Sequence, residues 1–277
     1  MTTPDPAQQL AQWLKAAREA ANMTTYDVAE RAGITQSRAS RLERGLATAT
    51  PELVRAWAEA TGTEASRVEA LVSEARRGTH QLRGNATVHG PGLMKRQRDM
   101  GEIRQAMTSF SEFSLAAIPG LLQVPGYATA IMERLSRISS MPGVAAAVSQ
   151  RMNNQSILYD PARTFSFVIS ESALHYQAGP PAVMRAQAEK ISSVVTLPNV
   201  SIAVLPFTAS QSLIIQSSFA IYEIPDEPLV LVELLAGEAI FTSIPDIQLY
   251  RDAFAEILNT AVTDRDAAQL ITSAMHG

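Results

Sequence analysis

The stretch ITQSRASRLERG, residues 34–45, carries polar side chains of the kinds that read DNA. Four of them recur at i, i+3, i+4 and i+7, the spacing that places side chains on one face of a helix: Ser37, Ser40, Arg41 and Arg44. Gln36 and Arg38 flank the N-terminal end of that face. Arg and Gln can bond bidentately to guanine and adenine edges, and short serines let the backbone come close. The stretch therefore predicts a short helix that enters a major groove.

Two glycines and a threonine set the limits of this predicted helix. Thr35 is a suitable N-cap, Gly33 ends the preceding helix and Gly45 ends this one. Ala39 and Leu42 can point into a helical bundle on the inner side. The polar face is then held outward by a small apolar core.

The first 75 residues read as five short helices. An apolar stripe at helical spacing marks the first one: Leu10, Trp13, Leu14 and Ala17. The second starts at Thr24, with Asp27 as the partner in a capping box. The fourth starts at Pro51, and a break at residues 61–63 precedes the fifth. The sequence predicts an all-α five-helix domain over residues 1–75.

The residues MTTYDVAERAGITQSRASRLERG, 23–45, resemble the helix-turn-helix of phage-repressor-like regulators, the Cro/C1 or XRE family. The resemblance extends over residues 8–72. It implies that one group of side chains approaches bases: Gln36, Ser37, Arg38 and Arg41. It implies that a second group lies near phosphates: Thr24, Thr25, Thr35, Ser40 and Arg44. Glu43 matches a structural acidic residue of the family, and Thr25 stands where the family often has glutamine.

An ordinary helical bundle with a solvated, arginine-bearing face is the simpler alternative. The turn, the glycine stops and the serine spacing together favour the helix-turn-helix. The net charge of −4 is uneven, with 8 basic and 10 acidic residues over 1–75, 7 and 2 over 76–104, and 8 and 15 over 105–277. This distribution excludes a non-specific nucleic-acid coat but allows DNA binding through a local patch.

The chain contains no cysteine, which excludes disulfides, thiolate metal sites and a cysteine nucleophile. No apolar run reaches the roughly 18–20 residues that span a bilayer, and the N-terminus has no secretory signal pattern. We therefore expect a cytoplasmic protein without a membrane partner.

Residues 76–94 predict a basic linker, since they combine Gly, Pro, Thr and basic residues without apolar periodicity. The linker is either a solvated tether or a segment that follows DNA phosphates through Arg76, Arg77 and Arg83. Two histidines of this region, nine residues apart, have no further ligand nearby, so we expect no metal site.

Residues 95–277 predict an α/β or α+β domain with about four strands. Stretches rich in Val, Ile and Phe predict the strands: 164–170, 199–207, 217–224 and 228–235. Helical patterns cover the rest: 95–113, a helix from Tyr127, 144–160, one that starts at Pro181, 244–262 and 264–275.

Four stretches of this domain look like the uncharacterised C-terminal domain of actinobacterial WhiJ-type regulators, which follow an XRE helix-turn-helix: 118–128, 151–158, 197–207 and 219–233. The resemblance implies a developmental or secondary-metabolism regulator, often encoded beside a small partner protein. The chain departs from the typical family text at FTSIPD, 241–246, and at AGPP, 178–181.

An enzymatic function has the least support in the sequence. Glu171 and His175 could share a helix face as a base–acid pair, but a local surface pair is the simpler interpretation. No nucleophile elbow or phosphate-binding glycine loop is present, so we expect no enzyme and no cofactor. Three methionines could line a ligand pocket or fill a core: Met132, Met152 and Met184.

The sequence therefore predicts a sequence-specific transcriptional regulator that binds double-stranded DNA as a homodimer and reads an inverted-repeat operator. A small partner protein or a ligand would act on the C-terminal domain. The alternative is an antitoxin-like interaction protein whose main role is to hold a small partner protein.

Overall fold

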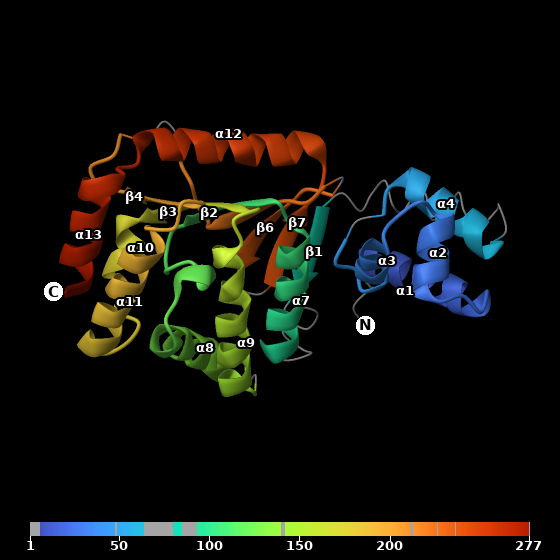
Figure 1. Cartoon of the computed structure of the whole chain (residues 1–277), viewed down its shortest axis with the longest axis horizontal. Coiled ribbons are helices and arrows are strands. Elements are labelled where there is room, and N and C mark those ends of the chain that lie inside the picture. The colour runs from blue at the N-terminus through green and yellow to red at the C-terminus, as the bar shows by residue number, and fades with distance from the viewer. Residues whose placement is uncertain are drawn as a thin grey trace. The chain divides into compact units, whose positions relative to one another are not determined.

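The computed structural model describes residues 6–47, 49–63, 80–84, 93–139, 142–210, 213–225, 227–235 and 237–276 (Figure 1). The chain divides into two compact units. The N-terminal unit comprises residues 1–81 and 241–243, and the C-terminal unit comprises 82–240 and 244–277. The predicted helical domain, 1–75, falls within the first unit.

Four of the five predicted N-terminal helices are described: α1 (Pro6–Ala20), α2 (Thr25–Arg31), α3 (Gln36–Glu43) and α4 (Pro51–Thr61). The fifth prediction, up to residue 72, lies outside the described residues. Val28, Leu42 and Val54 are buried between these helices. Trp57 is fully buried, and its indole N–H donates to the Leu14 carbonyl at 3.0 Å. This bond satisfies the ring's one polar atom inside an apolar core.

Side chains cap both α2 and α4, and the cap of α2 is the capping box that the sequence predicts. The Thr24 hydroxyl accepts from the Asp27 N–H at 3.2 Å, and the Asp27 carboxylate accepts from the Thr24 N–H at 2.7 Å. The Thr24 hydroxyl also donates to this carboxylate and, with the backbone bond, lowers the pKa of Asp27. Thr50 caps α4, and Gly62 ends it in the left-handed conformation.

The C-terminal unit is built on a mixed sheet. The strands of this sheet in the described residues are β1 (His80–Gly84), β2 (Ser109–Ser114), β3 (Thr164–Ser170), β4 (Val200–Leu205), β5 (Phe219–Glu223), β6 (Leu229–Leu234) and β7 (Gly237–Phe241). The boundary between the two units falls within β1, after Gln81, and within β7, before Phe241. The order across the sheet is β1-β7-β6-β5-β2-β3-β4. Strands β2, β3 and β4 run parallel, whereas β5 is antiparallel to both β2 and β6.

Helices cover both faces of this sheet (Figure 1). They are α7 (Leu93–Ala106), α8 (Pro125–Ser139), α9 (Val144–Asn154), α10 (Glu171–His175), α11 (Pro181–Val194), α12 (Ile244–Thr260) and α13 (Asp264–His276), with short turns η1 (Gly120–Leu122) and η2 (Gln155–Tyr159). Helix α12 crosses one face, where Phe219 packs between Phe113 and Tyr250. Helices α7, α8 and α9 lie against the other face, where the Phe110 ring meets Tyr222 edge-on at 4.9 Å.

The four predicted strands are confirmed with boundaries within two residues. The predicted helix over 95–113 is wrong in its second half, because α7 ends at Ala106 and 109–114 form the central strand β2. Residues 109–114 are extended because they pair with β3 on one side and β5 on the other. The local sequence pattern does not reveal these pairings. Strand β7 was missed, and β1 lies in the stretch predicted as linker. Residues 76–79 and 85–92 of that linker lie outside the described residues.

Candidate nucleic-acid interface

Helices α2 and α3 are joined by a tight turn that begins at Gly33. Its φ of +70° is in the left-handed region, which glycine adopts without strain. The Ile34 N–H then donates to the Ala29 carbonyl at 2.9 Å and closes the end of α2. Thr35 starts α3 as its N-cap, with its hydroxyl accepting from the Arg38 N–H at 3.2 Å. The predicted helix therefore exists with the predicted start.

The nine predicted contact residues lie on α3 and on the N-terminal end of α2. Five are exposed: Thr24, Thr35, Gln36, Ser37 and Arg44. Three are half-buried: Thr25, Arg38 and Ser40. Arg41 alone among the nine is buried. Most of the predicted set is thus accessible on one helix and the adjoining helix start.

Two hydrogen bonds orient side chains of this set. The Gln36 amide donates to the Thr25 hydroxyl at 3.1 Å, so the first residue of α3 is tied to the first residue of α2. The Arg44 guanidinium donates to the Ser40 carbonyl at 3.1 Å, which bends the side chain back along the C-terminal end of α3. Such bonds reduce the rotamer freedom that a DNA contact would otherwise have to restrict.

Arg41 lies on the same face of α3 as Ser37, as the spacing predicts, but its side chain is buried. Its exposed fraction is 5%, and its guanidinium donates to the Ser37 hydroxyl at 2.9 Å, one turn earlier on α3. A helical-wheel argument places the Cβ of Arg41 correctly but does not fix where a long side chain extends. The guanidinium therefore lies along the helix in this structure.

Glu43 has the structural role that the resemblance implied. Its carboxylate accepts both a 2.5 Å and a 2.8 Å bond from the Arg18 guanidinium, which also donates to the Met23 carbonyl at 2.9 Å. Both side chains are largely buried, and the bidentate bond raises the pKa of Arg18. The pair ties α1 to α3 and neutralises the one acidic side chain of α3.

Sequence reasoning missed Tyr26 as a candidate. It follows Thr25 in the first turn of α2, and its ring is 65% exposed. An exposed phenol beside proposed phosphate contacts can donate a hydrogen bond to a phosphate oxygen. Its position directly after the TT pair was the signal that could have identified it.

The structure brings Glu171 and His175 together, with 3.7 Å between Oε1 and Nε2. The same carboxylate accepts the Phe207 N–H at 2.7 Å, and the Phe207 ring stacks on His175. The pair therefore fastens a loop to α10 at the surface. Among the described residues, no group of three or more His, Asp or Glu could hold a metal ion. None of the described helices has the length and apolar character of a membrane span.

Comparisons with known proteins agree with the division of the chain. The profile "Helix-turn-helix" matches residues 14–67, and "Domain of unknown function (DUF5753)" matches residues 97–273, more than half of the chain. No curated protein matches.

Among solved structures, the chain is similar to TrmBL2, described as an archaeal chromatin protein with a novel mode of DNA binding, at 10% identity and a TM-score of 0.35. That match covers 95% of this chain and 100% of TrmBL2. On the two profile matches, the chain belongs to the DUF5753 family and carries an XRE-type helix-turn-helix domain in front of that domain.

Proposed function

We propose that the protein is a transcriptional regulator that binds a specific DNA operator as a homodimer. The observation that carries this proposal is α3 itself. It is a capped, eight-residue helix that presents exposed Gln36 and Ser37 at its N-terminal end, after a glycine turn. The N-terminal residues of the second helix are those that contact base edges when a helix-turn-helix docks.

The proposed contacts divide by type. Base edges are read by the first part of α3: Gln36, Ser37, Arg38 and Arg41. Phosphates are bound by the flanking positions: Thr24, Thr25, Thr35, Ser40 and Arg44. Because Arg41 is bonded to Ser37, the two side chains would reach DNA as a unit or after exchange of that bond.

One such helix reads too few base pairs for a specific site, so a dimer is required. The C-terminal unit is the proposed dimerisation and sensing part, acted on by a small partner protein or a ligand. A purified protein that binds DNA without sequence preference but retains a neighbour-encoded partner would instead favour the interaction-protein alternative.

The test compares alanine variants on a selected operator by fluorescence anisotropy at several salt concentrations. We expect Arg38→Ala and Arg41→Ala to cost about 1–3 kcal/mol each and to relax sequence preference. Arg44→Ala is expected to weaken all DNA similarly and to reduce the salt slope by about one.

The control is Arg55→Ala, which removes an exposed arginine from α4 of the same unit. It is expected to leave sequence preference unchanged. Wild-type affinity in both Arg38→Ala and Arg41→Ala would show that α3 does not read the operator.

A further inference from the structure

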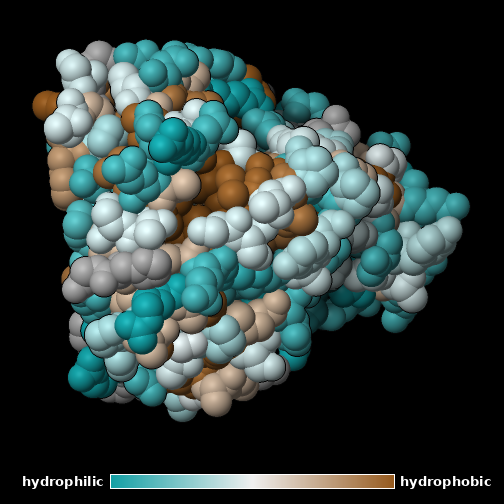
Figure 2. All heavy atoms as spheres, turned by 60° about the vertical axis from the view of Figure 1, so that its left-hand side comes forward, coloured by the Kyte–Doolittle hydropathy of each residue, from teal (hydrophilic) through white to brown (hydrophobic). Residues whose placement is uncertain are grey.

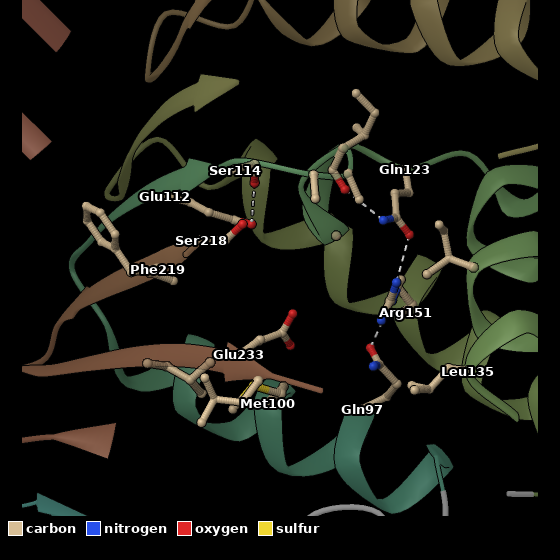
Figure 3. A pocket seen from close by; sticks show the side chains of 18 of the residues that line it. Gln97, Met100, Glu112, Ser114, Gln123, Leu135, Arg151, Ser218, Phe219 and Glu233 are labelled. Atoms are coloured by element: carbon tan, nitrogen blue, oxygen red, sulfur yellow. Dashed lines mark hydrogen bonds between the residues drawn. The ribbon is translucent and has the colours of Figure 1, made fainter. Parts of the chain in front are cut away.

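The C-terminal unit has a partly open cavity of about 340 Å³ beside its sheet (Figure 3). All of its lining residues lie between 97 and 237. They belong to α7, the segment from β2 to Gln123, α8, α9, β5 with Ser218 before it, β6 with Leu235 after it, and the first residue of β7. The volume is at the small end of the roughly 300–1,000 Å³ of known small-molecule sites.

Small side chains on the sheet leave this space open. Glu112 of β2 is paired in register with Ala220 of β5, and Ala220 with Leu231 of β6. These three residues lie on the face of the sheet that lines the cavity. Because Ala220 has only a methyl group, it leaves space between the longer side chains of Glu112 and Leu231. Ala116 and Ala117 continue the lining after β2.

A polar arc closes one side of the cavity. The Arg151 guanidinium donates to the Gln123 amide oxygen at 2.7 Å and to the Gln97 amide oxygen at 3.3 Å (Figure 3). Gln123 in turn donates to the Ile118 carbonyl at 2.8 Å. These bonds hold the loop between β2 and α8 against α7 and α9, so this wall of the cavity is preformed.

Glu112 and Glu233 project into the space from β2 and β6 (Figure 3). In the described part of the chain, the Glu112 carboxyl has one hydrogen bond, from the Ser114 hydroxyl at 3.1 Å, and no ion pair. Burial raises the pKa of Glu112 to about 7, with a smaller contribution from Glu233, against the attraction of Arg104 and Arg151. Ionisation of a buried carboxyl that is bonded to no cation is unfavourable.

The remaining walls are apolar. Met100, Ile118 and Met132 are buried there, and Leu135 lies half-buried beside them. Leu235, also on the lining, is 80% exposed. Methionine side chains adapt their shape to a bound apolar group. An apolar ligand group in the cavity would also cover the exposed Leu235.

We propose that this cavity binds a small organic amine, with its ammonium group between Glu112 and Glu233 and its apolar part against Met132 and Leu135. The inference rests on the ligand-sensing part of the proposed function and gives that ligand a chemical class. Binding would supply the counter-ion that Glu112 lacks, and the carboxyl would ionise and release its proton to solvent.

An anionic ligand is the competing chemistry, since Arg104 and Arg151 also line the cavity. Arg151 is already bonded to two amide oxygens, whereas the buried Nε of Arg104 has no hydrogen-bond partner among the described residues. An anion would nevertheless face two carboxylates, so the cation is the proposed ligand and hexanoate is the competing probe.

The test is calorimetry of the full-length protein, without DNA, against hexylamine, 1-hexanol and hexanoate at pH 7. We expect hexylamine to bind at least about tenfold more tightly than the other two. In two buffers of different ionisation enthalpy, it should release about half a proton, since the pKa of Glu112 is about 7.

Glu112→Gln is expected to weaken hexylamine binding about tenfold, abolish the proton release and leave 1-hexanol unchanged. Glu233→Gln, at an exposed position, tests the second carboxylate if Glu112→Gln does not fold. Glu189→Gln, exposed on α11 and outside the cavity lining, is the matched control. Hexanoate binding as tight as hexylamine, undiminished hexylamine binding in the Gln variants, or no heat with any probe would overturn the proposal. None of these results would bear on operator binding, which is measured separately.

Discussion

At the residue scale, the side chains of α3 divide into those that face solvent and those that build the domain. Sequence spacing identified Gln36 and Ser37 as exposed, because position on a helix sets the direction of short side chains. It did not predict that the Arg41 guanidinium is buried against Ser37, since a long flexible side chain can fold back along the helix. The position of the terminal group of a long side chain is therefore the part of the site that sequence predicts least well.

The Arg18–Glu43 pair should be a large contributor to the stability of the N-terminal unit. Arg18→Ala leaves a largely buried carboxylate without its partner, so we expect a loss of about 2–4 kcal/mol in the free energy of unfolding. Tryptophan fluorescence during urea unfolding measures it, because both tryptophans, Trp13 and Trp57, belong to this unit.

The control for Arg18 is Lys15→Ala, which removes an exposed ion pair with Glu19 on the same helix. That change should cost less than about 0.5 kcal/mol. Equal effects of the two substitutions would contradict the structural role of the Arg18–Glu43 pair.

Glu112 predicts a pH dependence of the C-terminal unit. Because its pKa is raised from 4.5 to about 7, the folded state holds this proton more tightly than the unfolded state. The stabilisation is complete below pH 4.5 and is lost as pH rises through about 7. Relative to Glu112→Gln, the free energy of unfolding should fall by at most about 3 kcal/mol between those values. Circular dichroism melts across this range measure it, and parallel pH profiles of the two proteins would contradict it.

At the element scale, prediction succeeded where a local signal defines the element. Capping threonines and glycine stops predicted α2 and α3, Pro51 predicted the start of α4, and runs of β-branched and aromatic residues predicted β3 to β6. Strand β2 was lost because SFSEFS follows a helical pattern directly, and only its two neighbouring strands make it extended. Strands β1 and β7 lie on one side of the sheet and lack a strong apolar run.

The loop 118–128 should depend on Gln187 of α11. This fully buried amide accepts the Val124 N–H at 2.9 Å and donates to the Leu122 carbonyl at 2.7 Å. Gln187→Met leaves both backbone groups unpaired, so we expect a loss of about 2–4 kcal/mol. Far-UV circular dichroism should show the change while tryptophan fluorescence does not, since the tryptophans report on the N-terminal unit.

Glu189→Gln, exposed on the same helix, should change stability by less than about 0.5 kcal/mol. An unchanged transition for Gln187→Met would mean that the loop is held by its apolar contacts alone.

At the scale of the whole molecule, the chain joins a helix-turn-helix unit to a unit with a cavity beside its sheet. The face drawn in Figure 2 shows hydrophobic side chains gathered in its middle within a hydrophilic surround. Helical patterns over residues 1–75 and mixed strand and helix patterns from residue 95 onward predicted a two-part organisation. The cavity was not foreseeable, since Glu112, Arg151 and Glu233 are distant in sequence and meet only through the sheet order.

The central claim is that α3 reads a specific operator. The most direct measurement is selection of bound duplexes from a random pool by the full-length protein at about physiological salt. The account predicts an enriched inverted repeat with half-sites about 10 base pairs apart, centre to centre, and no enrichment of it by a protein carrying Arg38→Ala and Arg41→Ala. A pool without an enriched motif, or the same motif recovered with the variant, would contradict the account.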